Sequence, residues 1–88
     1  MTDKRRTLPD VLAAARRESG LSLAEVAERM KDAETAGHGR AVTRQMLGHY
    51  ENPPKDRAAM PGADVLEALA WVYGVEVGSL YPSGAGAA

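Results

Sequence analysis

The residues best suited to chemistry gather between Thr35 and Tyr50, where basic side chains occur without any acidic one. This stretch holds two arginines and two histidines, which can donate hydrogen bonds to phosphate groups and to base edges. The whole chain hides this local polarity, because its 11 Lys+Arg and 12 Asp+Glu give a formal net charge of −1. Nucleic-acid binding is one interpretation of the stretch, and chance clustering in a short chain is the other.

Patterns typical of catalysis or metal binding are weak in the same sequence. The chain has no cysteine, which excludes thiol catalysis and cysteine metal sites. His49 and Glu51 would point apart on a helix, because side chains two positions apart do not share a helix face. No serine stands beside both a histidine and an acid; the serines are Ser19, Ser22, Ser79 and Ser83. We therefore expect no enzyme activity, no metal and no cofactor.

The length of 88 residues allows one small domain, which must rely on a packed core because no disulfide can form. We expect a basic arm over residues 1–6, a folded domain over 7–82 and a flexible tail over 83–88. No apolar run is long enough for a membrane span, and the N-terminus lacks the apolar stretch of a signal peptide. These features favour a soluble, cytoplasmic protein without a membrane partner.

The first two helices are predicted from their capping residues. Thr7 is a suitable N-cap, and Gly20 marks the end of the first helix. The segment 22–25, Ser-Leu-Ala-Glu, is typical of a capping box, and apolar residues at helical spacing follow it. The end of this second helix stays open, because residues 31–36 could prolong it before the Gly-His-Gly of 37–39 breaks it.

A third helix is expected from the N-cap Thr43 to about Glu51, and it has two distinct faces. Its core face is predicted to consist of Met46, Leu47 and Tyr50. The opposite face is polar, cationic and glycine-bearing; its residues are Arg44, Gln45, Gly48 and His49.

Two more helices complete the predicted fold. Residues 61–64 open a fourth helix that Gly74 closes, and 75–81 form a last short helix with Val77 and Leu80 as its core anchors. No strand pattern longer than four residues occurs. The sequence therefore predicts a compact, all-α fold of five short helices.

Three segments give the chain a resemblance to a known family. They are GLSLAEVAERM (20–30), VTRQMLGHYEN (42–52) and PGADVLEALAWVYGVEVGSLYP (61–82). In type and order they resemble the lambda-repressor-like helix-turn-helix family of phage repressor/Cro and xenobiotic-response-element regulators. The resemblance implies that helices 2 and 3 form a helix-turn-helix and that helix 3 enters the major groove of double-stranded DNA. It implies a transcriptional regulator, most simply a repressor, that acts as a homodimer on paired half-sites.

The resemblance also assigns roles to individual residues. Arg16 and Glu51 match two positions that form a largely buried structural ion pair; the alternative is two solvated surface charges. The residues matching base-reading positions are Arg44, Gln45, Gly48 and His49. Phosphate contacts are expected from a set of side chains that could equally be ordinary surface residues: Lys4, Arg5, Arg6, Ser22, Arg40, Thr43, Lys55 and Arg57.

Gly48 is unusual because a glycine in mid-helix lowers helix propensity by about 1 kcal/mol relative to alanine. Close approach of the helix backbone to DNA would explain it. Close packing between helices 2 and 3 would explain it equally well.

The chain departs from the family pattern in three places. Residues 31–41 lie between Met30 and Val42, about ten more than the usual short turn, which leaves the approach angle of helix 3 open. Leu23 occupies a position where the family commonly has a phosphate-binding glutamine. The loop after Glu51 is also longer, by about four residues.

Trp71 supports a different function. It lies off the predicted core face of the fourth helix, on a segment that carries acids and no base. An exposed tryptophan there favours a protein–protein contact; the alternative is a lone surface aromatic covered by the C-terminal tail. The rival to a DNA-binding regulator is therefore an antitoxin or small adaptor whose main partner is another protein, bound through Trp71.

Overall fold

The computed structural model describes residues 7–54 and 60–81, and its first helix, α1 (Leu8–Ser19), has the ends that the sequence predicts. The Thr7 hydroxyl accepts a hydrogen bond from the Asp10 N–H, and the Asp10 carboxylate accepts one from the Thr7 N–H, which closes a capping box. At the other end Gly20 has a φ of 71° and returns its N–H to carbonyl groups of the last turn.

Helix α2 (Leu23–Thr35) runs well beyond the apolar stripe that predicts it. The Ser22–Glu25 capping box is present at its start. The open question of its end is answered at Ala36, because Ala33 is fully buried and holds the extra turns on the core. Of the long segment 31–41, residues 31–35 therefore belong to α2.

Helix α3 (Arg44–Glu51) begins at Thr43, whose hydroxyl accepts a hydrogen bond from the Met46 N–H at 3.2 Å. Leu47 and Tyr50 are buried as expected, but the core position predicted for Met46 is wrong, since its side chain is 38 % exposed. Met46 stands in the first turn of α3, one turn before the buried Tyr50, so the core covers the later part of this helix but not its beginning.

Helix α4 (Ala63–Tyr73) supplies a large share of the core and ends at Gly74, with a φ of 71°. The helix expected over 75–81 is shorter than predicted: η1 (Val77–Leu80) is a single turn of 3₁₀ helix. Glu76 has an extended backbone, with a φ of −78° and a ψ of 147°, so the helix begins only at Val77 and holds four residues. The predicted anchor Leu80 is buried, and Val77 is partly buried against the core.

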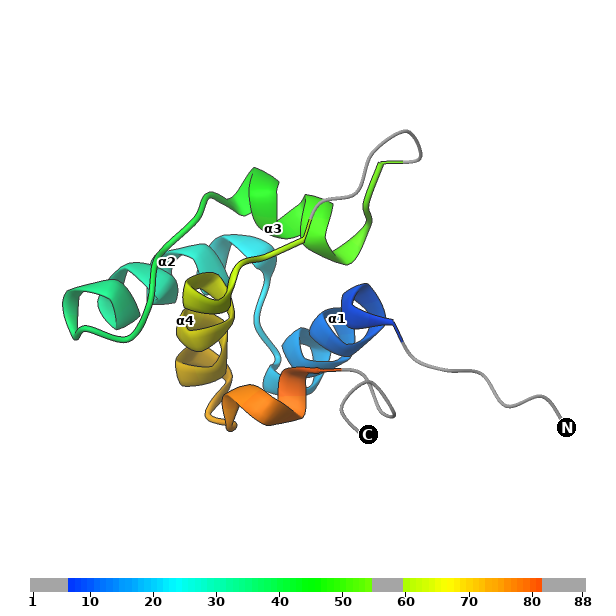
Figure 1. The fold of residues 1–88 in the computed structure, drawn as a ribbon. Coiled ribbons are helices and arrows are strands. Elements are labelled where there is room, and N and C mark those ends of the chain that lie inside the picture. The colour runs from blue at the N-terminus through cyan, green and yellow to red at the C-terminus, as the bar shows by residue number, and fades with distance from the viewer. Residues whose placement is uncertain (1–6, 55–59, 82–88) are drawn as a thin grey trace, which may run out of the picture.

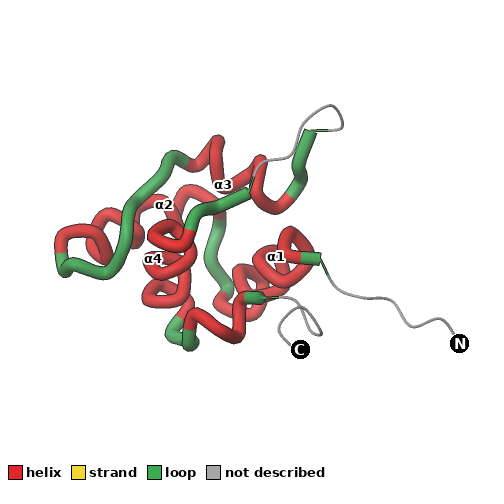
Figure 2. Tube along the Cα trace, in the orientation of Figure 1, coloured by secondary structure: helices red, strands yellow, loops and turns green. Residues whose placement is uncertain are grey.

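The helices pack around one core, with α4 against α2 and with α1 against α3 and η1 (Figure 1). The four α-helices and η1 make up all the regular structure of the described residues, which contain no strand (Figure 2). The fold is compact and all-helical. None of the described helices is both long and apolar enough to cross a membrane. The largest fully buried side chains of the core are Leu12, Val26, Met30, Leu69 and Leu80.

Candidate nucleic-acid interface

Helix α3 lies at an edge of the molecule (Figure 1), and the polar side chains of its first turn are exposed. Leu47 and Tyr50 fix the inner side, because both are buried against neighbouring helices. On the outer side Arg44 and Gln45 are exposed, and Arg44 makes no ion pair with any described residue. Both side chains are therefore accessible to a partner.

The outer face has the donors and acceptors that base recognition requires. An arginine can grip guanine with two hydrogen bonds, a glutamine can pair with adenine, and a histidine can donate to guanine or to phosphate. His49 is half-buried beside the two exposed side chains of the first turn. An α-helix with its side chains is about 10–12 Å in diameter, which fits a major groove about 12 Å wide.

Gly48 is not required by the packing of α2 against α3. A Cβ atom added to it would meet only the Leu23 Cδ1 atom, at 3.8 Å, which is an ordinary van der Waals contact. Leu23 is itself partly buried against the core. The geometry therefore does not support close packing between α2 and α3 as the reason for this glycine.

Among the predicted phosphate-binding residues, Ser22 and Thr43 lie at the N-termini of α2 and α3. Each hydroxyl oxygen accepts a backbone N–H, from Glu25 or Met46, and the Thr43 hydroxyl hydrogen stays available as a donor. Arg40 is exposed, with its Nη1 atom 4.0 Å from the Asp64 carboxylate. The remaining candidates lie outside the described residues: Lys4, Arg5, Arg6, Lys55 and Arg57.

Residues 36–43, here called the strap, connect α2 to α3 and run back alongside α2, next to α4 (Figure 2). The Arg40 N–H donates to the Asp64 carbonyl at 3.1 Å, and the Ala41 N–H donates to the Glu34 carboxylate at 3.3 Å. The strap is therefore bonded to both α4 and α2. Sequence reasoning left its course open, because a loop without periodicity does not reveal its tertiary partner.

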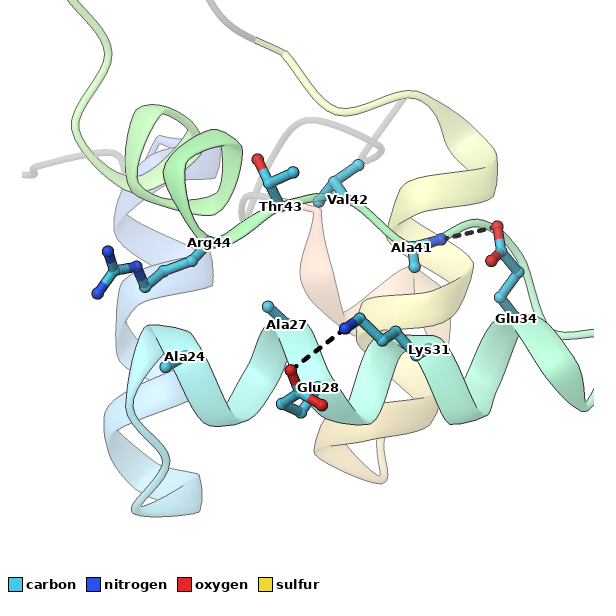
Figure 3. A pocket seen from close by; sticks show the side chains of 9 residues that line it. All are labelled: Ala24, Ala27, Glu28, Lys31, Glu34, Ala41, Val42, Thr43 and Arg44. Carbon is cyan, nitrogen blue, oxygen red and sulfur yellow. Dashed lines mark hydrogen bonds and ion pairs between the residues drawn. The ribbon is translucent and has the colours of Figure 1, made fainter.

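A groove of about 690 Å³ lies between α2 and the end of the strap (Figure 3). Its apolar surface includes Ala24, Ala27 and Val42, and Arg44 lies at one end. Lys31 crosses its floor to pair with Glu28 at 3.3 Å. The sequence carried no signal for this groove, since it exists only because the strap returns alongside α2.

Arg16 and Glu51, the predicted ion pair, are in contact, with the Arg16 Nε atom 2.8 Å from a Glu51 oxygen. This hydrogen bond raises the pKa of Arg16, so the guanidinium is more firmly charged than usual. The phenol of Tyr73 is largely buried, and burial together with the Glu51 charge raises the pKa of Tyr73. The pair fixes the C-terminal end of α3.

Trp71, the predicted protein-binding residue, is 44 % exposed and has a partner within the chain. Its ring stacks on the ring of His38 in the strap, with centroids 5.9 Å apart and planes 20° apart. The His38 Nδ1 atom also lies 3.9 Å from the Glu67 carboxylate of the same helix. Sequence reasoning missed this contact, because 33 positions separate the two rings.

The described residues contain no group of three His, Asp or Glu side chains that could hold a metal ion. Comparison with protein-family models, with curated proteins and with solved structures finds no match to this chain. Its function is therefore inferred from its own residues.

Proposed function

We propose that this protein is a sequence-specific double-stranded DNA-binding transcriptional regulator, acting as a repressor, that reads the major groove with α3. The observation that carries the proposal is the outward face of α3, where Arg44 and Gln45 are exposed and free of acidic neighbours in the sequence from 36 to 49. In this proposal α2 and α3 are a helix-turn-helix whose turn is enlarged by the strap, and η1 stands for the fifth helix of the family.

The charge distribution supports the proposal and limits it. Residues 1–57 hold all 11 basic residues and nine acids, whereas residues 58–88 hold three acids and no base. Only residues 1–57 need to contact DNA. The total of −1 gives modest non-specific affinity, so base contacts and dimerisation supply a larger share of the binding than bulk charge does.

A homodimer follows from the small size of the reading surface. One eight-residue helix buries too little surface for tight, specific binding. Two symmetric copies whose α3 helices lie about 34 Å apart would address one face of the duplex, one helical turn apart. The expected operator is therefore a palindrome of two short half-sites.

Selection of bound fragments from random double-stranded DNA, followed by sequencing, tests the proposal. The bound pool should converge on paired half-sites, with affinity that falls steeply as salt rises. Arg44→Ala should relax the preference at one base position in each half-site, by about 1–3 kcal/mol of discrimination. The matched control is Arg17→Ala, which removes the same charge from an exposed site at the end of α1. A pool that stays random in sequence contradicts the proposal.

The second candidate is an antitoxin or adaptor that binds another protein. The exposure of Trp71, on a base-free segment, favours it. Such a protein would show no selected DNA sequence and no salt-dependent DNA affinity. The same selection experiment, run at two salt concentrations, therefore separates the two functions.

A further inference from the structure

Four consecutive residues of the strap are anchored to the helices beneath it. The first anchor is the His38 ring, which stacks on Trp71 of α4. The His38 N–H also donates to the Ala33 carbonyl at 2.8 Å, so this residue ties the strap to α2 as well. A stacked aromatic pair stabilises a contact beyond the area it buries.

The second anchor is Gly39, where the strap backbone lies against the backbone of α4. A Cβ atom on Gly39 would overlap the Asp64 carbonyl oxygen and would come within 2.7 Å of the Ala68 nitrogen. Its φ of 97° is a conformation that side-chain-bearing residues rarely adopt. The position therefore admits only glycine without a shift of the strap.

The third anchor is the hydrogen bond from the Arg40 N–H to the Asp64 carbonyl, and the fourth is the one from the Ala41 N–H to the Glu34 carboxylate. Only Val42 then separates the anchored residues from Thr43, the N-cap of α3. Arg44 and Gln45 follow at once in the first turn. The point at which the strap leaves α4 therefore sets the position of the first turn of α3, and with it the positions of Arg44 and Gln45.

We propose that the strap, clamped on α4 by Trp71 and Gly39, sets the position of α3 for DNA reading, and that Trp71 is a positioning residue for this purpose. The inference rests on the proposed function. It gives Trp71 a role within the chain: α4 holds the strap, the strap holds the N-terminus of α3, and base selectivity depends on that placement. Misplacement of a helix that carries several base contacts weakens all of them together.

Amide hydrogen exchange of the DNA-free protein tests the clamp. Trp71→Ala and Gly39→Ala should each speed the exchange of the Leu47 amide, which bonds to the Thr43 carbonyl, by about threefold to tenfold. Amides in the middle of α1 should not change. Trp71→Tyr, which keeps an aromatic ring, should restore the slow exchange. Tyr81→Ala is the matched control, because Tyr81 is an equally exposed aromatic, at 46 %, outside the strap contact.

The second measurement is the ratio of affinities for a selected site and for a random duplex, taken well below the unfolding temperature of each variant. Trp71→Ala should lower this ratio about tenfold, Trp71→Tyr should restore it, and Tyr81→Ala should leave it unchanged. A general loss of stability would not change this ratio at such temperatures.

The outcomes separate the inference from the function on which it rests. Unchanged exchange of α3 amides in both Trp71→Ala and Gly39→Ala overturns the clamp, whatever the DNA result. Faster exchange with an unchanged affinity ratio overturns the positioning role in DNA reading. Faster exchange in a protein whose wild type selects no DNA overturns the proposed function and supports the clamp as the device that orders α3.

Discussion

Arg16 and Glu51, 35 positions apart in the sequence, form a bidentate ion pair that joins α1 to the last residue of α3. The Arg16 Nε atom donates to one Glu51 oxygen at 2.8 Å, and the Nη2 atom donates to the other at 3.0 Å. The remaining Nη1 atom donates to the Leu21 carbonyl at 3.1 Å. One guanidinium thus connects α1, α3 and the turn before α2.

Replacing Arg16 alone should destabilise the fold strongly. The Glu51 side chain is only 6 % exposed, so Arg16→Met leaves a desolvated carboxylate without its partner. We expect a loss of about 3 kcal/mol in the free energy of unfolding, at the lower end for buried pairs because Arg16 keeps some contact with water. Urea denaturation measures the loss.

The double variant Arg16→Met/Glu51→Leu checks the origin of that loss. It removes both charges and should be more stable than Arg16→Met alone, because no charge is left buried. If the losses in the free energy of unfolding of Arg16→Met and Glu51→Leu simply add in the double variant, the two residues do not interact energetically.

Gly48→Ala should separate stability from DNA binding. Alanine favours the helix by about 0.5–1 kcal/mol over glycine, and a Cβ atom there meets only Leu23 at an ordinary distance. The variant should therefore unfold at a higher urea concentration. Its affinity for the selected DNA site should nevertheless fall if the α3 backbone approaches the duplex at this residue. A less stable variant would restore the explanation by close packing between α2 and α3.

The capping box of α2 should make stability depend on pH in the acid range. Hydrogen bonds from the Ser22 backbone N–H and the Ser22 hydroxyl lower the pKa of Glu25 below its ordinary value of 4.5. The folded state therefore binds this proton more weakly than the unfolded state. The stabilisation is complete above the unfolded pKa and is lost as pH falls through the folded one. Urea midpoints between about pH 5 and 3 should fall less in Glu25→Ala than in a control, Glu18→Ala, at an exposed site on α1.

Tyr73 should produce the opposite dependence at alkaline pH. Burial, and to a lesser degree the Glu51 charge, raises the pKa of Tyr73 above its ordinary value of 10.0. The folded state therefore holds the phenolic proton more tightly than the unfolded state. The stabilisation is complete below the unfolded pKa and is lost as pH rises from there toward the folded one. Between about pH 9 and 11, the urea midpoint of Tyr73→Phe should fall less than that of the wild type, whereas the exposed-site control Tyr81→Phe should follow the wild type.

Local signals in the sequence were sufficient for the α-helix starts and for most of their ends. Thr7, Ser22 and Thr43 each cap the helix that was predicted from them, and Gly20 and Gly74 end α1 and α4. Capping needs only residues within one turn of each other, so a short segment contains the whole interaction. Helix periodicity placed Leu47 and Tyr50 inside for the same reason.

The tertiary structure decided what depends on partners far away in the chain. Met46 is exposed although it shares a helix face with the buried Tyr50, because only the later part of α3 packs on the core. The strap lies next to α4, where His38 stacks on Trp71. Local periodicity identifies the faces of each helix, but only the packing of helices against one another decides which side is buried and where a non-periodic segment runs. The sequence by itself thus determined the helices and the polar residues of α3, and the tertiary structure alone decided how that face is held and turned outward.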